Sequence, residues 1–302
     1  MLKNLEHFVQ VLKIEKNYSS NTIDSYLSDI KSFEKYLIKR KISFKDTINQ
    51  SDVIKKYFRY LSRSKISPRS IKRKFSSLSS YFLYLIDRKV IKKNPLNGIY
   101  TPKLTKKLPT ILSVDEIQKI FKQSENTDNE LLGLRDRCII ELLYSCGLRV
   151  SELCELKINN IQFDANVIRF FGKGNKERII PLTFYAKEWL EKYLYQSRQI
   201  LSNRKTSDQK YVFLSNNGKR LTRAAIWQSI KKYVNAAGIT KSVSPHTFRH
   251  SFATHLIDGG ANLIEIQKLL GHSDISTTEI YVHLSKEFID SEYMKAFDKK
   301  KN

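Results

Sequence analysis

Cysteine, proline, glycine and acidic side chains are all scarce in this sequence. Its 302 residues include three Cys, six Pro, ten Gly and only 30 Asp and Glu. The cysteines, Cys138, Cys146 and Cys154, are odd in number and eight residues apart. They therefore cannot form a disulfide framework, a reducing compartment is favoured, and we expect small core residues. No Cys-x-x-Cys pair is present for zinc.

Long apolar runs and nucleotide-binding motifs are also missing. No stretch of 18 apolar residues occurs, and charges interrupt the N-terminal segment, which is typical of an amphipathic helix. We therefore expect a cytoplasmic protein without a membrane span. The turn at residues 172–176, GKGNK, lacks the spacing of a P-loop, and no βαβ alternation is found. These absences leave the use of ATP unsupported.

Basic residues, by contrast, are abundant and unevenly distributed. Lys and Arg number 54, and the net charge is +24. Residues 1–110 hold 25 basic and 8 acidic side chains, and residues 63–107 hold 13 basic residues against Asp87 alone. Such an excess indicates a polyanionic partner. Nucleic acid is the favoured partner, and an anionic membrane surface is the second candidate.

Apolar spacing and helix-capping residues predict two mainly helical domains. Residues 1–100 form the first, residues 101–112 (with two Pro and three Lys) a basic linker, and residues 113–302 the second. Caps are expected at Ser19, at Ser67 before Pro68, and at Ser113, where SVDE has capping-box spacing. After Ser67, the basic residues that lie off the apolar stripe and are available to phosphates are Arg69, Lys72 and Arg73.

The second domain is expected to be mainly α with a small β-sheet. Strands are predicted at 167–171 and 178–182, joined by a tight turn. Helices are predicted at 131–144, 184–202, 222–236, 246–258, 262–270 and 286–298. Gly147 should end the first of these helices, and Ser151 is a candidate cap for a short one that follows.

Histidine is concentrated near the C-terminus. Five of the six histidines lie between residues 246 and 283. His246 and Arg249 are neighbours on one helical face, near a helix N-terminus, which suits an oxyanion such as phosphate. A zinc helix is disfavoured, because Thr-Phe-Arg separates His246 from His250. We expect His250, His255 and His283 to be buried and hydrogen-bonded.

Two further basic anchors lie upstream of the histidines. Arg149 follows Gly147, with Glu152 close enough to orient it through a charge-assisted hydrogen bond. Lys173 lies on the tight turn. Each is weak evidence alone, as are His272 in LGHSD and Tyr281.

The order of these residues is specific. GLRVSEL, GKGNKER, HTFRHSFATH, LGH and Tyr281 follow one another as in the tyrosine recombinase (phage integrase-like) family, which the whole chain resembles. The sequence is most similar to the Xer type. The resemblance implies a helical core-binding domain and an α/β-hairpin catalytic domain that form a C-shaped clamp on DNA. It also implies site-specific recombination, with chromosome dimer resolution and segregation as the expected role.

The resemblance further implies a role for each motif residue. Tyr281 would attack a phosphate that Arg149, Lys173, His246, Arg249 and His272 surround, forming a 3′-phosphotyrosyl link without metal or cofactor. Two arginines would stabilise the phosphate charge, His246 would accept the Tyr281 proton, and Lys173 would protonate the leaving 5′ oxygen. Glu152 would support the site. Tyr293 is a rival nucleophile at the wrong distance from LGH.

Several alternatives and partners remain open on the sequence. The chain could be an integrase of a plasmid, phage or transposon, a non-catalytic basic DNA-binding protein, or a metal-dependent nuclease. The linker lysines expected to contact DNA are Lys103, Lys106 and Lys107. The family implies a DNA-dependent homo- or hetero-tetramer, a possible second recombinase and a possible FtsK-type translocase. A segment at about 286–302 would dock on a neighbour, with contacts expected from Leu284, Phe288, Ile289 and Met294. Packing of these residues within their own chain is the alternative.

Overall fold

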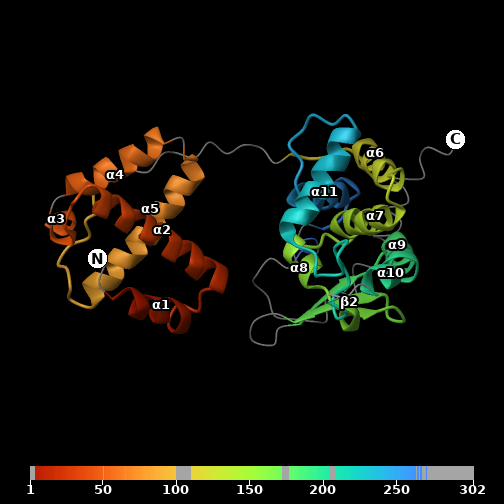
Figure 1. Cartoon of the computed structure of the whole chain (residues 1–302), viewed down its shortest axis with the longest axis horizontal. Helices are drawn as coiled ribbons and strands as arrows, with labels where there is room; N and C mark the ends of the chain where they lie inside the picture. Colours follow the sequence, from red (N-terminus) through yellow and green to blue (C-terminus); the bar gives the residue numbers. More distant parts are fainter. Residues whose placement is uncertain are drawn as a thin grey trace. The chain divides into compact units, whose positions relative to one another are not determined.

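The computed structural model describes residues 4–49, 51–64, 66–99, 110–171, 177–203 and 208–262, together with 264, 266 and 270. The chain divides into two compact units, residues 1–107 and 108–302. In Figure 1, unit 1 runs from red to orange and unit 2 from yellow to blue. Among the described residues, no helix is long and apolar enough to cross a bilayer.

Unit 1 is a bundle of helices: α1 (Leu5–Ile14), α2 (Ser20–Lys39), α3 (Phe44–Asn49), α4 (Ser51–Arg63) and α5 (Pro68–Asp87). Ser19 and Ser67 cap α2 and α5 as predicted, since their hydroxyls accept the backbone N–H groups of Thr22 and Ser70. The apolar faces meet in one core that includes Phe8, Phe33, Tyr57, Leu78 and Phe82.

Unit 2 is built around α7 (Glu130–Ser145), most of whose residues are buried. Its other elements are α6 (Val114–Glu125), α8 (Val150–Glu155), η1 (Ile158–Asn160), β1 (Ile161–Gln162), β2 (Val167–Phe171), β3 (Glu177–Pro181), α9 (Phe184–Lys192), η3 (Tyr193–Arg198), α10 (Gln199–Ser202), α11 (Arg223–Ala236) and α12 (Pro245–Asp258). Helices α6, α9, α11 and α12 all pack against α7. The strands form an antiparallel sheet in the order β1-β2-β3.

The structure confirms the strands predicted at 167–171 and 178–182 and the helices predicted at 131–144, 222–236 and 246–258, to within one residue at their ends. The helix predicted at 184–202 is interrupted by the π-helical segment η3, and β1 was not predicted. Ser113 and Glu116 form the expected capping box, and the three cysteines are buried. One detail is wrong: Arg149, and not Ser151, is the N-cap of α8, because the Glu152 carboxylate accepts the backbone N–H of Arg149 at 2.7 Å. The helix expected at 262–270 lies partly, and that at 286–298 entirely, outside the described residues.

Candidate active site and nucleic-acid interface

The turn between α7 and α8 places Arg149 beside α12. Gly147 ends α7 with φ 57°, a conformation that favours glycine, and a Cβ there would lie 2.8 Å from the Leu270 Cδ2 atom. A side chain at this position would thus collide with its surroundings. The Gly147 carbonyl accepts a hydrogen bond at 2.6 Å from Nη1 of Arg249, which projects from the first turns of α12. This hydrogen bond therefore holds both the Gly147 turn and the Arg249 guanidinium in place.

Arg149 and Arg249 converge on a single backbone oxygen. The Leu270 carbonyl accepts hydrogen bonds from Nη2 of Arg149, at 3.3 Å, and from Nη2 of Arg249. Two guanidinium groups within reach of one oxygen can also hold two oxygens of one phosphate, because each presents a planar fork of donors. The structure thus brings together two arginines that lie 100 residues apart in the sequence.

Glu152 holds Arg149, the first arginine of this pair. Its Oε1 atom accepts from Nη1 of Arg149 at 2.8 Å and also contacts Nη1 of Arg178 in β3. Sequence reasoning predicted the contact with Arg149 and overlooked Arg178. The available signal was positional, because Arg178 lies two residues before the apolar Ile180 and so faces the same side of β3.

The cluster gathers three guanidinium groups, of which Arg178 and Arg249 are largely buried while the Arg149 side chain is 36% exposed. Only 7% of the Arg249 surface is exposed. Burial, followed by the charges of Arg149 and Arg178, lowers the pKa of Arg249 to about 10, and Glu152 opposes this shift. Among the described residues, the Glu152 carboxylate contacts two of these guanidinium groups, those of Arg149 and Arg178. An anion bound here would remove the repulsion, which makes the cluster a candidate oxyanion site.

His246 lies at the exposed N-terminal turn of α12, beside the arginine cluster. Burial, then the charges of His250, Arg249 and Arg149, lowers the pKa of His246. Its imidazole is therefore neutral near pH 7 and able to accept a proton.

The other two described histidines of this region differ in their burial. His255 is half-buried, and its Nδ1 atom pairs with the Tyr144 hydroxyl at 2.9 Å, as expected. The expectation for His250 was wrong: it is exposed, because it occupies the solvent face of α12. Within the described ranges, no three His, Cys, Asp or Glu residues are grouped to hold a metal.

The structure does not describe every candidate residue. Lys173, His272, Tyr281 and His283 lie outside the described residues, as do Lys103, Lys106, Lys107 and the predicted docking residues Leu284, Phe288, Ile289 and Met294.

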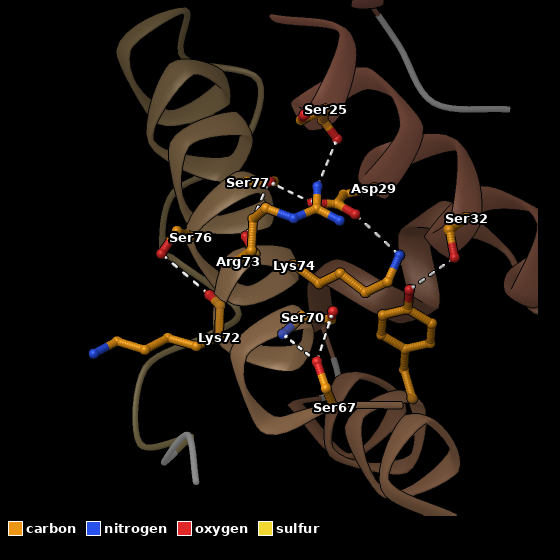
Figure 2. Close-up of polar contacts among 11 residues, drawn as sticks. Ser25, Asp29, Ser32, Ser67, Ser70, Lys72, Arg73, Lys74, Ser76 and Ser77 are labelled. Carbon is orange, nitrogen blue, oxygen red and sulfur yellow. Dashed lines mark hydrogen bonds and ion pairs between the residues drawn. The ribbon is translucent and has the colours of Figure 1, made fainter. Parts of the chain in front are cut away.

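The three predicted DNA contacts of α5 differ in their surroundings. Arg69 and Lys72 are exposed, and Figure 2 shows Lys72 extending away from the other labelled cations. Arg73 is directed to α2, where its Nη1 atom binds Asp29 at 2.6 Å and the Ser25 carbonyl at 3.2 Å. Since 45% of its side chain remains exposed, Arg73 can still present charge to solvent.

A basic groove in unit 1 lies along α2 and was missed by the sequence reasoning. Its walls combine four cations and two tyrosines with one acid. The lining residues are Asp24, Leu27, Ser28, Lys31, Ser32, Lys35, Tyr36, Lys39, Arg40 and Tyr60. Lys31, Lys35 and Lys39 recur every four residues, which was the available signal for a basic helix face.

Comparison with known proteins matches both units. Residues 110–287 match the model of the phage integrase family, and residues 5–89 match the phage integrase N-terminal SAM-like domain. The chain is 40% identical over 289 residues to tyrosine recombinase XerD of Staphylococcus haemolyticus, covering 96% of each protein.

Solved structures show the same fold. XerH site-specific recombinase bound to difH substrate, in a pre-cleavage complex, is 25% identical with a TM-score of 0.66, covering 93% of this chain and 82% of that one. A lambda integrase(75-356) dimer bound to a COC' core site matches in fold, at 22% identity and a TM-score of 0.67, with coverage of 91% and 97%.

Proposed function

The chain belongs to the phage integrase family of tyrosine recombinases, and from that premise we propose that it cuts and rejoins duplex DNA at a specific site in chromosome dimer resolution. The observation that carries the proposal is the convergence of Arg149 and Arg249 on one oxygen position, beside a neutral His246. Integration of a mobile element is the alternative role, and no feature of the site favours it.

The reaction we propose is a transesterification. The Tyr281 phenolate oxygen attacks phosphorus, the P–O5′ bond breaks, and a 3′-phosphotyrosyl link forms. His246 accepts the phenol proton, and Lys173 donates a proton to the departing 5′ oxygen. Arg149, Arg249 and His272 bind the non-bridging oxygens, whose charge grows in the transition state. Religation reverses each transfer, so the bond energy is conserved without ATP.

We propose that unit 1 supplies most of the affinity for the DNA backbone. Arg69, Lys72 and Arg73 on α5, the groove lysines of α2 and the linker residues Lys103, Lys106 and Lys107 provide the positive charge. Phosphate contacts of this kind position a protein on DNA without reading its sequence.

The working assembly we propose is a tetramer on two DNA sites, formed in the cytoplasm where chromosomal DNA lies. A related structure supports a DNA-bound multimer, since the lambda integrase fragment is a dimer on its core site. A second recombinase and an FtsK-type translocase are the candidate partners.

Covalent trapping on nicked duplexes tests the proposal. We expect the wild-type chain, in EDTA, to yield a protein–DNA band on a denaturing gel. Tyr281→Phe should bind the same duplex and give no band, because it lacks the nucleophilic oxygen. Tyr293→Phe is the matched control and should behave as wild type. Adduct formed by Tyr281→Phe would contradict the assigned nucleophile, and adduct dependent on divalent metal would contradict the mechanism.

A further inference from the structure

Arg178 faces the interior of unit 2 because of its register in the sheet. It pairs with Phe170 of β2, two positions from the pair Ile168 and Ile180, which are both fully buried. Residues two apart on a strand face the same side. The Arg178 side chain is accordingly only 13% exposed.

The Glu152 carboxylate contacts two arginines, Arg149 and Arg178. Oε1 accepts from Nη1 of Arg149 and also contacts Nη1 of Arg178, while Oε2 accepts the backbone N–H of Arg149. The Glu152 carboxylate therefore links the guanidinium groups of Arg149 and Arg178, which come from α8 and β3.

The charge of Arg178 reaches Arg249 as well. Arg149 and Arg178 both disfavour the charged form of Arg249, whereas Glu152 favours it. Arg178 is thus electrostatically coupled to each arginine that faces the candidate phosphate position.

We propose that Arg178 is a positioning residue. By sharing Glu152 with Arg149, it holds the Glu152 carboxylate, and through it Arg149, in the orientation that faces the scissile phosphate, and it adds its own positive charge to the cluster. The inference rests on the proposed function. Without Arg178, Glu152 would pair with Arg149 alone, and the cluster would lose one positive charge. The penalty should therefore fall on the step that builds negative charge on the phosphate oxygens.

Single-turnover adduct formation by Arg178→Gln tests this assignment on three substrates. They carry at the scissile position an ordinary phosphodiester, a methylphosphonate without the non-bridging charge, or a phosphorothiolate whose 5′ sulfur leaves without a proton. On the phosphodiester we expect the rate to fall about 10- to 100-fold, as for loss of a charge-assisted contact. The defect should largely disappear on the methylphosphonate and persist on the phosphorothiolate. Arg178→Lys should retain more activity, because it keeps the charge.

Arg220→Gln is the matched control, because Nη1 of Arg220 binds Glu155 at 2.6 Å in an exposed pair of the same unit. It should react at the wild-type rate, and thermal unfolding should show both variants folded. If Arg178→Gln does not fold, adduct formation by the folded Arg178→Lys variant is measured on the same three substrates.

Three results would overturn the inference alone: an unchanged phosphodiester rate, rescue by the phosphorothiolate only, or an equal defect on all substrates. A wild-type chain that forms no adduct would instead overturn the proposed function, and this inference with it.

Discussion

At the residue scale, Gly147 combines two constraints that few positions share. Its φ is 57°, and a Cβ would lie 2.8 Å from Leu270 and 3.0 Å from Phe252. Gly147→Ala should lower the free energy of unfolding of unit 2 by about 1–3 kcal/mol, from backbone strain plus overpacking. Chemical denaturation measures this loss.

Gly238→Ala is the control for Gly147→Ala. Gly238 has φ 70° and no atom within 4 Å of a built Cβ, so its loss should reflect strain alone. An equal loss at both positions would show that the close approach at Gly147 contributes nothing.

His246 determines the acid side of the pH profile in this mechanism. Burial and three neighbouring cationic or titratable groups, His250, Arg249 and Arg149, lower its pKa. Because the neutral form accepts the proton, activity is present above the lowered pKa and lost as pH falls through it. We expect single-turnover rates to hold down to about pH 6.5, the ordinary histidine value, and to fall below it. An acid limb centred above that pH would contradict the assignment.

At the element scale, Asp29 joins α2 to α5. Its carboxylate is 1% exposed and binds Arg73 Nη1 at 2.6 Å, Lys74 Nζ at 3.0 Å and the Ser77 hydroxyl at 2.9 Å (Figure 2). Asp29→Ala would leave Lys74, whose side chain is 12% exposed, without its partner. We expect the free energy of unfolding of unit 1 to fall by about 3 kcal/mol, measured by urea denaturation.

Asp52→Ala is the matched control for Asp29→Ala. Asp52 pairs with Lys55 at 3.6 Å on the surface, with side chains 73% and 44% exposed. Its removal should cost less than about 0.5 kcal/mol. A similar effect at both positions would argue against a stabilising role for the buried network.

At the scale of the whole molecule, the net charge of +24 is concentrated in the first 110 residues. Each phosphate neutralised by a basic side chain steepens the salt dependence of DNA binding. Lys31→Gln with Lys35→Gln, in the groove of unit 1, should reduce the slope of log K against log salt by about 2. Fluorescence anisotropy over a salt series measures this slope.

The matched control for the groove lies in unit 2. Lys119→Gln with Lys122→Gln removes the same charge from the exposed side of α6. We expect this pair to leave the slope nearly unchanged. Equal effects from the two pairs would mean that general charge, and not the groove, governs the dependence on salt.

The sequence by itself determined the starts of α2, α5 and α6, the strand pair β2 and β3, and the family. Ser19, Ser67 and Ser113 cap helices through residues three positions away, so local sequence was sufficient for these starts. The ordered motifs with Arg149, His246 and Arg249 identify the chemistry, because their residue types and order are visible without coordinates.

Only the tertiary structure decided which side chains share a partner. Arg178 meets Glu152 across 26 residues, and Arg249 meets the Gly147 carbonyl across 102 residues. Arg73 is directed to Asp29, 44 residues away, although a helical projection leaves it free. Such contacts depend on how α8, β3 and α12 pack and on how α5 lies against α2. The spacing of residues within one element does not predict that packing, because each partner belongs to a separate element.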